Sequence, residues 1–77
     1  MLDMTLAELQ AKQKQTLERL IEDAGSPTHL AKMLNIHPMR LRGWIDRGRV
    51  SKAGARLVAE HPSLGEHYKA EDLRPDL

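Results

Sequence analysis

The chain has 77 residues, the size of one small domain, and a net charge of +1. It contains no cysteine, which excludes a disulfide framework and a thiolate metal site. No apolar run approaches the roughly 18 residues of a membrane span, and no signal-peptide pattern opens the chain. We therefore expect one domain over residues 1–77, located inside the cell, and a core small enough to favour association with a second copy.

Charge is unevenly distributed along the chain. Residues 1–26 carry a net charge of −2, residues 27–35 carry +1, residues 36–56 carry +5 and residues 57–77 carry −3. Within the basic stretch the single acid is Asp46. A positive segment between acidic ends is typical of a protein that binds a polyanion on one face, although a solvated basic surface without a partner has the same composition.

The first predicted helix begins at the Thr5–Glu8 capping box and ends at Gly25. A polar stretch, Lys12–Thr16, divides its apolar positions into two groups. We expect the C-terminal group to pack on the domain, and the N-terminal group, within an extension over residues 1–15, to meet a partner or fray. The apolar positions are Leu6, Leu9, Leu17, Leu20, Ile21 and Ala24.

A second helix is predicted from the N-cap Ser26 and the first helical residue Pro27 to about Leu34. Asn35 tolerates the left-handed conformation and so suits a corner, after which Ile36 is expected to point inward. The third helix begins near Pro38 and ends at Gly48, with Leu41, Trp44 and Ile45 predicted as its core face.

A fourth helix is predicted from the cap Ser51 to Pro62, with apolar surface from Ala55, Leu57, Val58 and Ala59. In the tail, residues 63–77, Lys69–Leu73 is expected to form one helical turn that Pro75 prevents from extending. Because no alternating β pattern occurs, the fold class predicted is all-α, a compact domain of about five helices.

The unit over residues 26–46 predicts two short helices joined by a tight turn, the arrangement that places one helix in the DNA major groove. The first turns of the helices beginning at Pro27, Pro38 and Lys52 contain no acid. Helix N-termini carry partial positive charge. Three such N-termini without an acidic side chain nearby are suited to bind the phosphate groups of a ligand. Chance is a rival explanation, because each first turn is short.

The outward face of the third helix carries Met39, Arg42, Gly43 and Asp46. Arg42 can offer two parallel donors to guanine, and Met39 can pack against a thymine methyl. Gly43 costs about 1 kcal/mol relative to Ala in a helix, which makes sense where the backbone approaches a ligand closely. The alternatives are an exposed arginine without a partner and a tolerated glycine.

Residues at the beginning of the second helix, on the flank of the third helix and around its end are candidates for contacts to the DNA backbone, which fix orientation without reading sequence. Solubility is the alternative role for each of them, and Arg56, more distant, is typical of it. Trp44 is interpreted as core, since a single-strand binder would need several exposed aromatics. The candidate backbone contacts are Thr28, His29, Arg40, Arg47, Arg49 and Lys52.

Other chemistry has little support in the sequence. The four histidines do not stand at metal-ligand spacing, and no nucleophile with a base, phosphate loop or zinc-protease motif is present. We therefore expect no metal, no cofactor and no enzymatic activity. The histidines are His29, His37, His61 and His67.

Residues 16–51 resemble the helix-turn-helix of the Cro-like prophage repressors and the related YdaS-type antitoxins. The matching positions are Leu30-Ala31, Leu34-Asn35-Ile36, Leu41, Trp44-Ile45 and Gly48-Arg49-Val50, and the closing Leu73-Arg74-Pro75-Asp76-Leu77 is similar to the C-terminal motif of the same group.

The resemblance implies a lambda-repressor-like fold whose motif core is Leu30, Ala31, Leu34, Asn35, Ile36, Leu41, Trp44 and Ile45. Asn35 stands where the family usually has Gly. The family's base-reading positions hold Pro38, Met39, Arg42 and Gly43 here, where Gln, Ser, Asn or Lys are more usual. This departure leaves most of the direct readout to Arg42.

Together these features predict a sequence-specific regulator of transcription, a phage or prophage repressor in the cytoplasm of a bacterial host. It would bind double-stranded DNA as a homodimer, on a pseudo-palindromic operator with half-sites roughly 34 Å apart. One alternative is an antitoxin or regulator that acts mainly through a protein partner held by the acidic tail and the N-terminal extension. Another is an interaction bundle that is basic without binding DNA.

Overall fold

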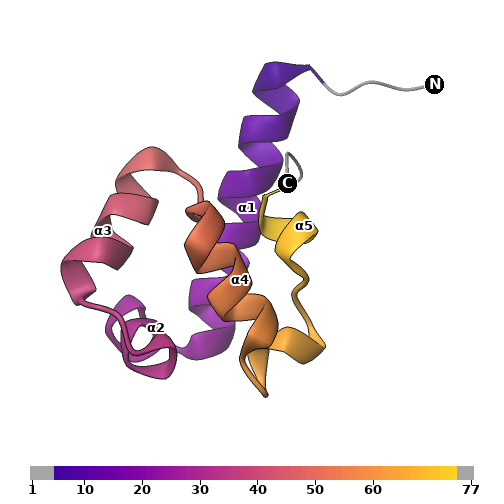
Figure 1. The fold of residues 1–77 in the computed structure, drawn as a ribbon. Helices are drawn as coiled ribbons and strands as arrows, with labels where there is room; N and C mark the ends of the chain where they lie inside the picture. Colours follow the sequence, from indigo (N-terminus) through magenta and orange to yellow (C-terminus); the bar gives the residue numbers. More distant parts are fainter. Residues whose placement is uncertain (1–4, 75–77) are drawn as a thin grey trace.

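The computed structural model describes residues 5–74, and every regular element in this part of the chain is helical. The prediction of an all-helical, compact domain is therefore confirmed. None of these helices combines the length and the apolar character that crossing a membrane requires. The elements are α1 (Leu6–Ala24), α2 (Pro27–Leu34), α3 (Pro38–Arg47), α4 (Lys52–Glu60), the short 3₁₀ helix η1 (Leu64–Glu66) and α5 (Ala70–Leu73) (Figure 1).

Capping side chains begin the helices where the sequence predicts. The Glu8 backbone N–H donates to Thr5 Oγ1 at 3.1 Å, and the His29 N–H donates to Ser26 Oγ at 3.1 Å. The Gly54 N–H donates to Ser51 Oγ at 3.0 Å. Each bond satisfies one of the amide groups that a helix N-terminus leaves without an internal partner.

The cap of α3 is one that the sequence analysis did not identify. His37 precedes Pro38, and its Nδ1 accepts a hydrogen bond from the Met39 N–H at 3.1 Å. An accepting Nδ1 is the unprotonated nitrogen of the ring. His37 therefore holds the beginning of α3 and so has a structural role in this fold.

Left-handed residues end α2 and α3. Asn35 has φ 55° and ψ 45°, and Gly48 has φ 73°. Asn is among the few non-glycine residues that adopt this conformation at low cost, so the chain can reverse sharply between α2 and α3. The predicted corner is confirmed.

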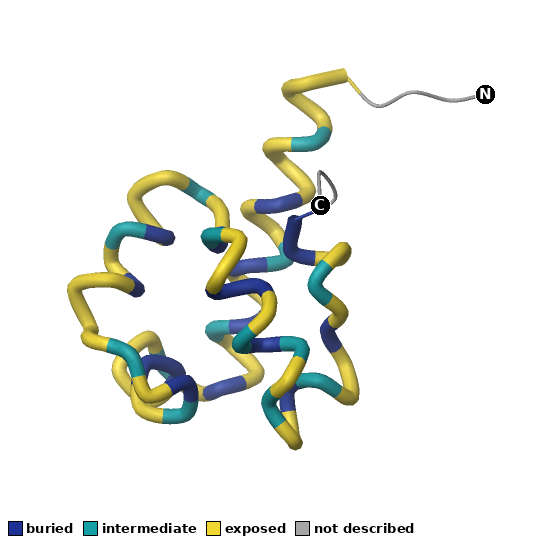
Figure 2. Tube along the Cα trace, viewed as in Figure 1, coloured by how far each residue is buried: buried dark blue, intermediate teal, exposed yellow. Residues whose placement is uncertain are grey.

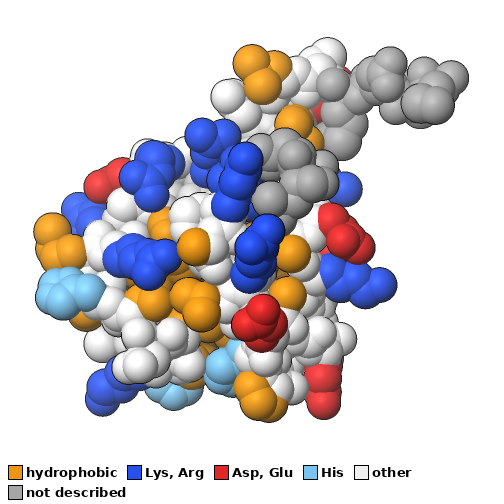
Figure 3. All heavy atoms as spheres, in the orientation of Figure 1, with side chains coloured by type: hydrophobic (Ala, Val, Ile, Leu, Met, Phe, Trp, Pro, Cys, Tyr) orange, Lys and Arg blue, Asp and Glu red, His pale blue; other side chains and the backbone are white. Residues whose placement is uncertain are grey.

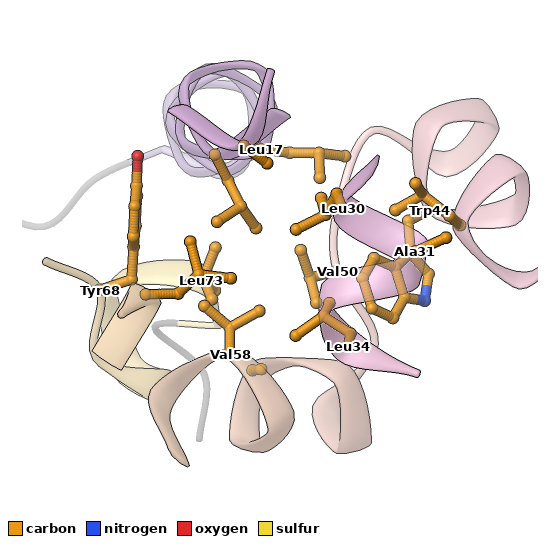
Figure 4. Packing of buried hydrophobic residues seen from close by; sticks show 14 residues of the cluster. Leu17, Leu30, Ala31, Leu34, Trp44, Val50, Val58, Tyr68 and Leu73 are labelled. Carbon is orange, nitrogen blue, oxygen red and sulfur yellow. The ribbon is translucent and has the colours of Figure 1, made fainter. Parts of the chain in front are cut away.

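α1 packs against α2 and α5, α4 packs against α5 and η1, and α3 packs against α2. One hydrophobic cluster lies between them, and Figure 4 shows the indole of Trp44 pointing from α3 into it. A methyl group on Gly54 would lie 2.3 Å from Trp44 Cζ2, so α4 needs glycine there for the indole to fit. The cluster comprises Leu17, Leu20, Ala24, Leu30, Ala31, Leu34, Leu41, Trp44, Val50, Ala55, Val58, Leu64, Tyr68 and Leu73.

The prediction that Ile45 belongs to the core is wrong. Leu41 and Trp44 are 1% and 0% exposed, but Ile45 is 39% exposed, and Ile36 is only half-buried. Figure 1 shows α3 at the edge of the molecule, where it packs mainly on α2. A short helix with few neighbours buries a narrow stripe, and Ile45 falls at its margin.

The two halves of α1 differ as the sequence predicts. Leu17, Leu20 and Ala24 are buried, whereas Leu6 is 70% exposed on turns that extend beyond the other helices (Figure 2). Gln13, in the polar stretch, is 4% exposed and continues the buried side of the helix. Residues 1–4 of the predicted extension lie outside the described part of the chain.

The tail packs more closely than the sequence analysis anticipated. η1 places Leu64 in the core, and the predicted turn appears as α5, with Leu73 buried. Arg74 Nη1 donates to the Val50 carbonyl oxygen at 3.3 Å, which ties the tail to the loop before α4. Residues 75–77, the rest of the C-terminal motif, lie outside the described part of the chain.

Candidate nucleic-acid interface

Positive charge gathers on one face of the fold. Figure 3 shows Lys and Arg side chains over α3, the loop that follows it and α4. All six basic side chains of residues 36–56 are exposed. They are Arg40, Arg42, Arg47, Arg49, Lys52 and Arg56.

The outward face of α3 carries three of the four residues predicted to read bases, and the fourth begins the helix. Met39 is 70% exposed, and Arg42 and Asp46 form an ion pair with 3.4 Å between Nε and Oδ1. The side-chain atoms nearest to a methyl group on Gly43 would be those of the Arg47 guanidinium group, at 3.5 Å, an ordinary contact. The fold therefore leaves room for a methyl group at position 43.

Beside this face lies a groove between the beginning of α2 and α3, with a volume of about 270 Å³. It brings together Pro38, Met39 and Arg42 from the predicted readout set and Thr28 from the predicted backbone set, but not Gly43. Its lining residues are Pro27, Thr28, Pro38, Met39, Leu41, Arg42 and Ile45.

A second hollow, of about 470 Å³, lies between the N-terminal half of α1 and the loop after α3. It joins Arg47 and Arg49 with Lys14, a cation that the sequence analysis did not include. A methyl group on Gly48 would lie 3.9 Å from Lys14 Cβ and Cγ, so the lysine stem lies against the turn. The lining is completed by Gln10, Ala11, Gln13 and Gly48. Nothing local in the sequence marks Lys14, because its basic neighbours follow much later in the chain.

Three other candidate backbone contacts lie apart from both hollows. Arg40 is exposed on α3, and Lys52 is exposed at the beginning of α4. His29 is exposed, but its Nδ1 contacts the carbonyl oxygen of Ala24. Because a carbonyl oxygen only accepts, Nδ1 donates there and the ring holds α2 to the end of α1.

The helices differ in whether an acidic residue lies in the first turn. α2, α3 and α4 have no acid in the first turn, whereas α1 has Glu8, and α5 has Glu71 and Asp72. The helices without an acid are those of the basic face or next to it. The positive ends of these helices add to the field of the arginines there.

A third hollow, of about 710 Å³, lies between α1 and the tail. Tyr68 is 5% exposed, its hydroxyl donates to Asp23 Oδ2 at 2.5 Å, and Figure 4 shows this hydroxyl directed toward α1. Burial, and then the bond to Asp23, raises the pKa of Tyr68 above its ordinary value. We interpret this pair as a structural link between α1 and the tail.

Comparison with protein-family models, with curated proteins and with solved structures found no match to this chain. Its function is therefore inferred from the residues of these surfaces and from their arrangement.

Proposed function

We propose that this protein is a sequence-specific, double-stranded-DNA-binding regulator of the Cro-like helix-turn-helix type. The observation that carries the proposal is the outward face of α3, where Met39 and Arg42 are exposed, Gly43 directly follows Arg42 in the helix, and basic side chains gather on the same face of the fold. α3 would enter the major groove and α2 would lie across the backbone.

The proposed roles follow from the chemistry of each group. The guanidinium group of Arg42 reads guanine, because two of its N–H donors match O6 and N7. Arg47 and Arg49 bind phosphate at one edge of the face, and Lys52 binds it at the beginning of α4. Arg40, Thr28 and His29 are further proposed contacts to the backbone. A cytoplasmic homodimer on a pseudo-palindromic operator completes the proposal.

The test is selection of bound duplexes from a random pool by the full chain, followed by titration at several salt concentrations. We expect an enriched sequence with two inverted half-sites, and an affinity that falls steeply as salt is added, because bound phosphates release counterions. Absence of binding, or binding that salt does not affect, would refute the proposal.

A second candidate is a regulator or antitoxin that acts mainly through a protein partner. Leu6, 70% exposed on the part of α1 that extends beyond the other helices, favours it, because this position leaves the leucine accessible to a helix of another chain. Co-purification of the full chain with another protein at fixed stoichiometry, lost in Leu6→Gln, would support this candidate. If Leu6→Gln instead dissociates a homodimer, the same surface serves self-association.

A further inference from the structure

The groove beside α3 holds an apolar patch that the core does not explain. Among residues 5–74 the exposed large hydrophobic side chains are Leu6, Met39 and Ile45, and the last two both line this groove. Exposed apolar side chains gathered at one hollow mark a binding surface more often than single ones do. Ile45 lies at the margin of the buried stripe of α3, and this position leaves it on the lining of the groove together with Met39.

The lining of the groove restricts what can bind there. Two prolines, Pro27 and Pro38, and the side chains of Met39 and Ile45 make it largely apolar, and Arg42 is the only charged residue in its lining. A ligand that fits this lining presents an apolar group next to a group that accepts hydrogen bonds.

The ion pair between Arg42 and Asp46 uses only Nε of the guanidinium group, so its terminal N–H groups can donate to a ligand. Asp46 accepts from Nε at 3.4 Å, and no other hydrogen bond to the Arg42 side chain occurs within residues 5–74. The two terminal nitrogens of the guanidinium group thus remain available as a parallel pair of donors, the arrangement that binds guanine O6 and N7.

We propose that this groove holds the 5-methyl group of a thymine that neighbours the guanine bound by Arg42. The inference rests on the proposed function and names the bases that its site reads. In the major groove the thymine methyl is the apolar group that a base pair presents, and O6 and N7 of a guanine in the adjacent pair face the same groove. The basic surroundings favour a polyanionic duplex over an apolar segment of another protein.

The experiment replaces single thymines by uracil in a duplex selected by the full chain, because uracil lacks only the methyl group and keeps every hydrogen-bonding edge. We expect one thymine, next to a guanine, at which this change weakens binding by about fourfold, the effect of removing one buried methyl-sized group. Thymine-to-uracil changes elsewhere in the site should have little effect.

Protein variants then test whether the thymine methyl group contacts the lining of the groove. In Ile45→Ala and in Met39→Ala, thymine and uracil at that position should bind with nearly equal affinity, whereas Leu6→Ala, which removes an exposed hydrophobic residue outside the groove, should keep the full ratio. Both groove positions are exposed, and circular dichroism will confirm that each variant is folded.

The outcomes separate the two proposals. If no duplex binds, the proposed function fails. If duplex binds with a preference that depends on Arg42 but no thymine-to-uracil change matters, or if both groove variants keep the wild-type ratio, the groove assignment alone is wrong. If Ile45→Ala abolishes self-association and leaves the ratio intact, the groove is a protein contact, which also overturns the assignment.

Discussion

Asp46 Oδ1 lies 3.4 Å from Arg42 Nε, one helical turn further along the outward face of α3. Both side chains are largely exposed, so the pair contributes at most about 1 kcal/mol to the stability of the free protein. Asp46 is nevertheless the only acid in residues 36–56, on a surface that we propose to face phosphate. We therefore expect that the role of Asp46 is to orient the guanidinium group of Arg42.

Arg42→Ala should cost about 1–3 kcal/mol of binding free energy on the selected operator and relax the preference at one base pair, because a bidentate contact to guanine is lost. Titration against the operator and against single-base variants measures both effects. Arg56→Ala is the control: it removes an exposed charge from the same basic stretch and should leave base preference unchanged. Intact affinity and preference in Arg42→Ala would disprove the assignment.

Asp46→Asn should strengthen binding to duplex of any sequence but weaken the preference for the operator sequence. Loss of a negative charge should strengthen binding to non-operator duplex by up to about tenfold, since an acid near phosphate is repelled. Preference for guanine at the Arg42 position should decrease, because the guanidinium group is no longer held. Glu60→Gln is the control, because it removes an exposed negative charge at the end of α4, outside the basic stretch. A parallel change in operator and non-operator affinity would leave Asp46 with no part in readout.

Lys14→Ala and Arg49→Ala should weaken all duplex sequences alike. Arg49 is a proposed phosphate contact, and we expect Lys14 to be another because it lines the same hollow. Removal of either contact should make the slope of log affinity against log salt less steep by about 0.9. Lys12→Ala is the control, because this lysine is exposed on the same helix but does not line the hollow with Arg47 and Arg49. If Lys12→Ala and Lys14→Ala change the slope equally, the hollow has no special role.

Two glycine substitutions should have opposite effects on stability. Gly54→Ala forces a methyl group to within 2.3 Å of Trp44 Cζ2, and this overpacking should lower the free energy of unfolding by about 1–3 kcal/mol. Gly43→Ala has room and should raise it by up to about 1 kcal/mol through helix propensity, while it weakens duplex binding. Urea denaturation and titration measure these quantities. If the Gly43→Ala variant is more stable and binds DNA as tightly as wild type, the backbone of α3 does not approach the DNA closely at this position.

Tyr68 should make stability depend on pH in the alkaline range. Burial raises its pKa above the ordinary value of about 10, so the folded chain holds the phenolic proton more tightly than the unfolded chain. The contribution of Tyr68 to the free energy of unfolding is therefore complete below about pH 10 and is lost as the pH rises beyond that value. Urea denaturation at about pH 8 and about pH 11 should show a larger loss in wild type than in Tyr68→Phe. Equal losses would contradict the role of this hydroxyl.

Much of the fold could be predicted because the signals that begin and end helices are local. Ser26 and Ser51 accept hydrogen bonds from amides three residues ahead, and Asn35 adopts a conformation that its own side chain tolerates. Such features depend on residues within one turn, which a linear sequence displays directly. The outward position of Met39 and Arg42 followed in the same way, from helical periodicity on a short segment.

Residues whose roles depend on distant partners were decided only by the tertiary structure. Lys14 joins Arg47 and Arg49 because α1 extends past the loop after α3, and Tyr68 is buried because the tail folds back on Asp23. Ile45 has the helical spacing of a core residue, but α3 lies at the edge of the molecule and buries only the stripe that its neighbours cover. Periodicity states which residues share a face of a helix; how much of that face is covered depends on the helices packed against it.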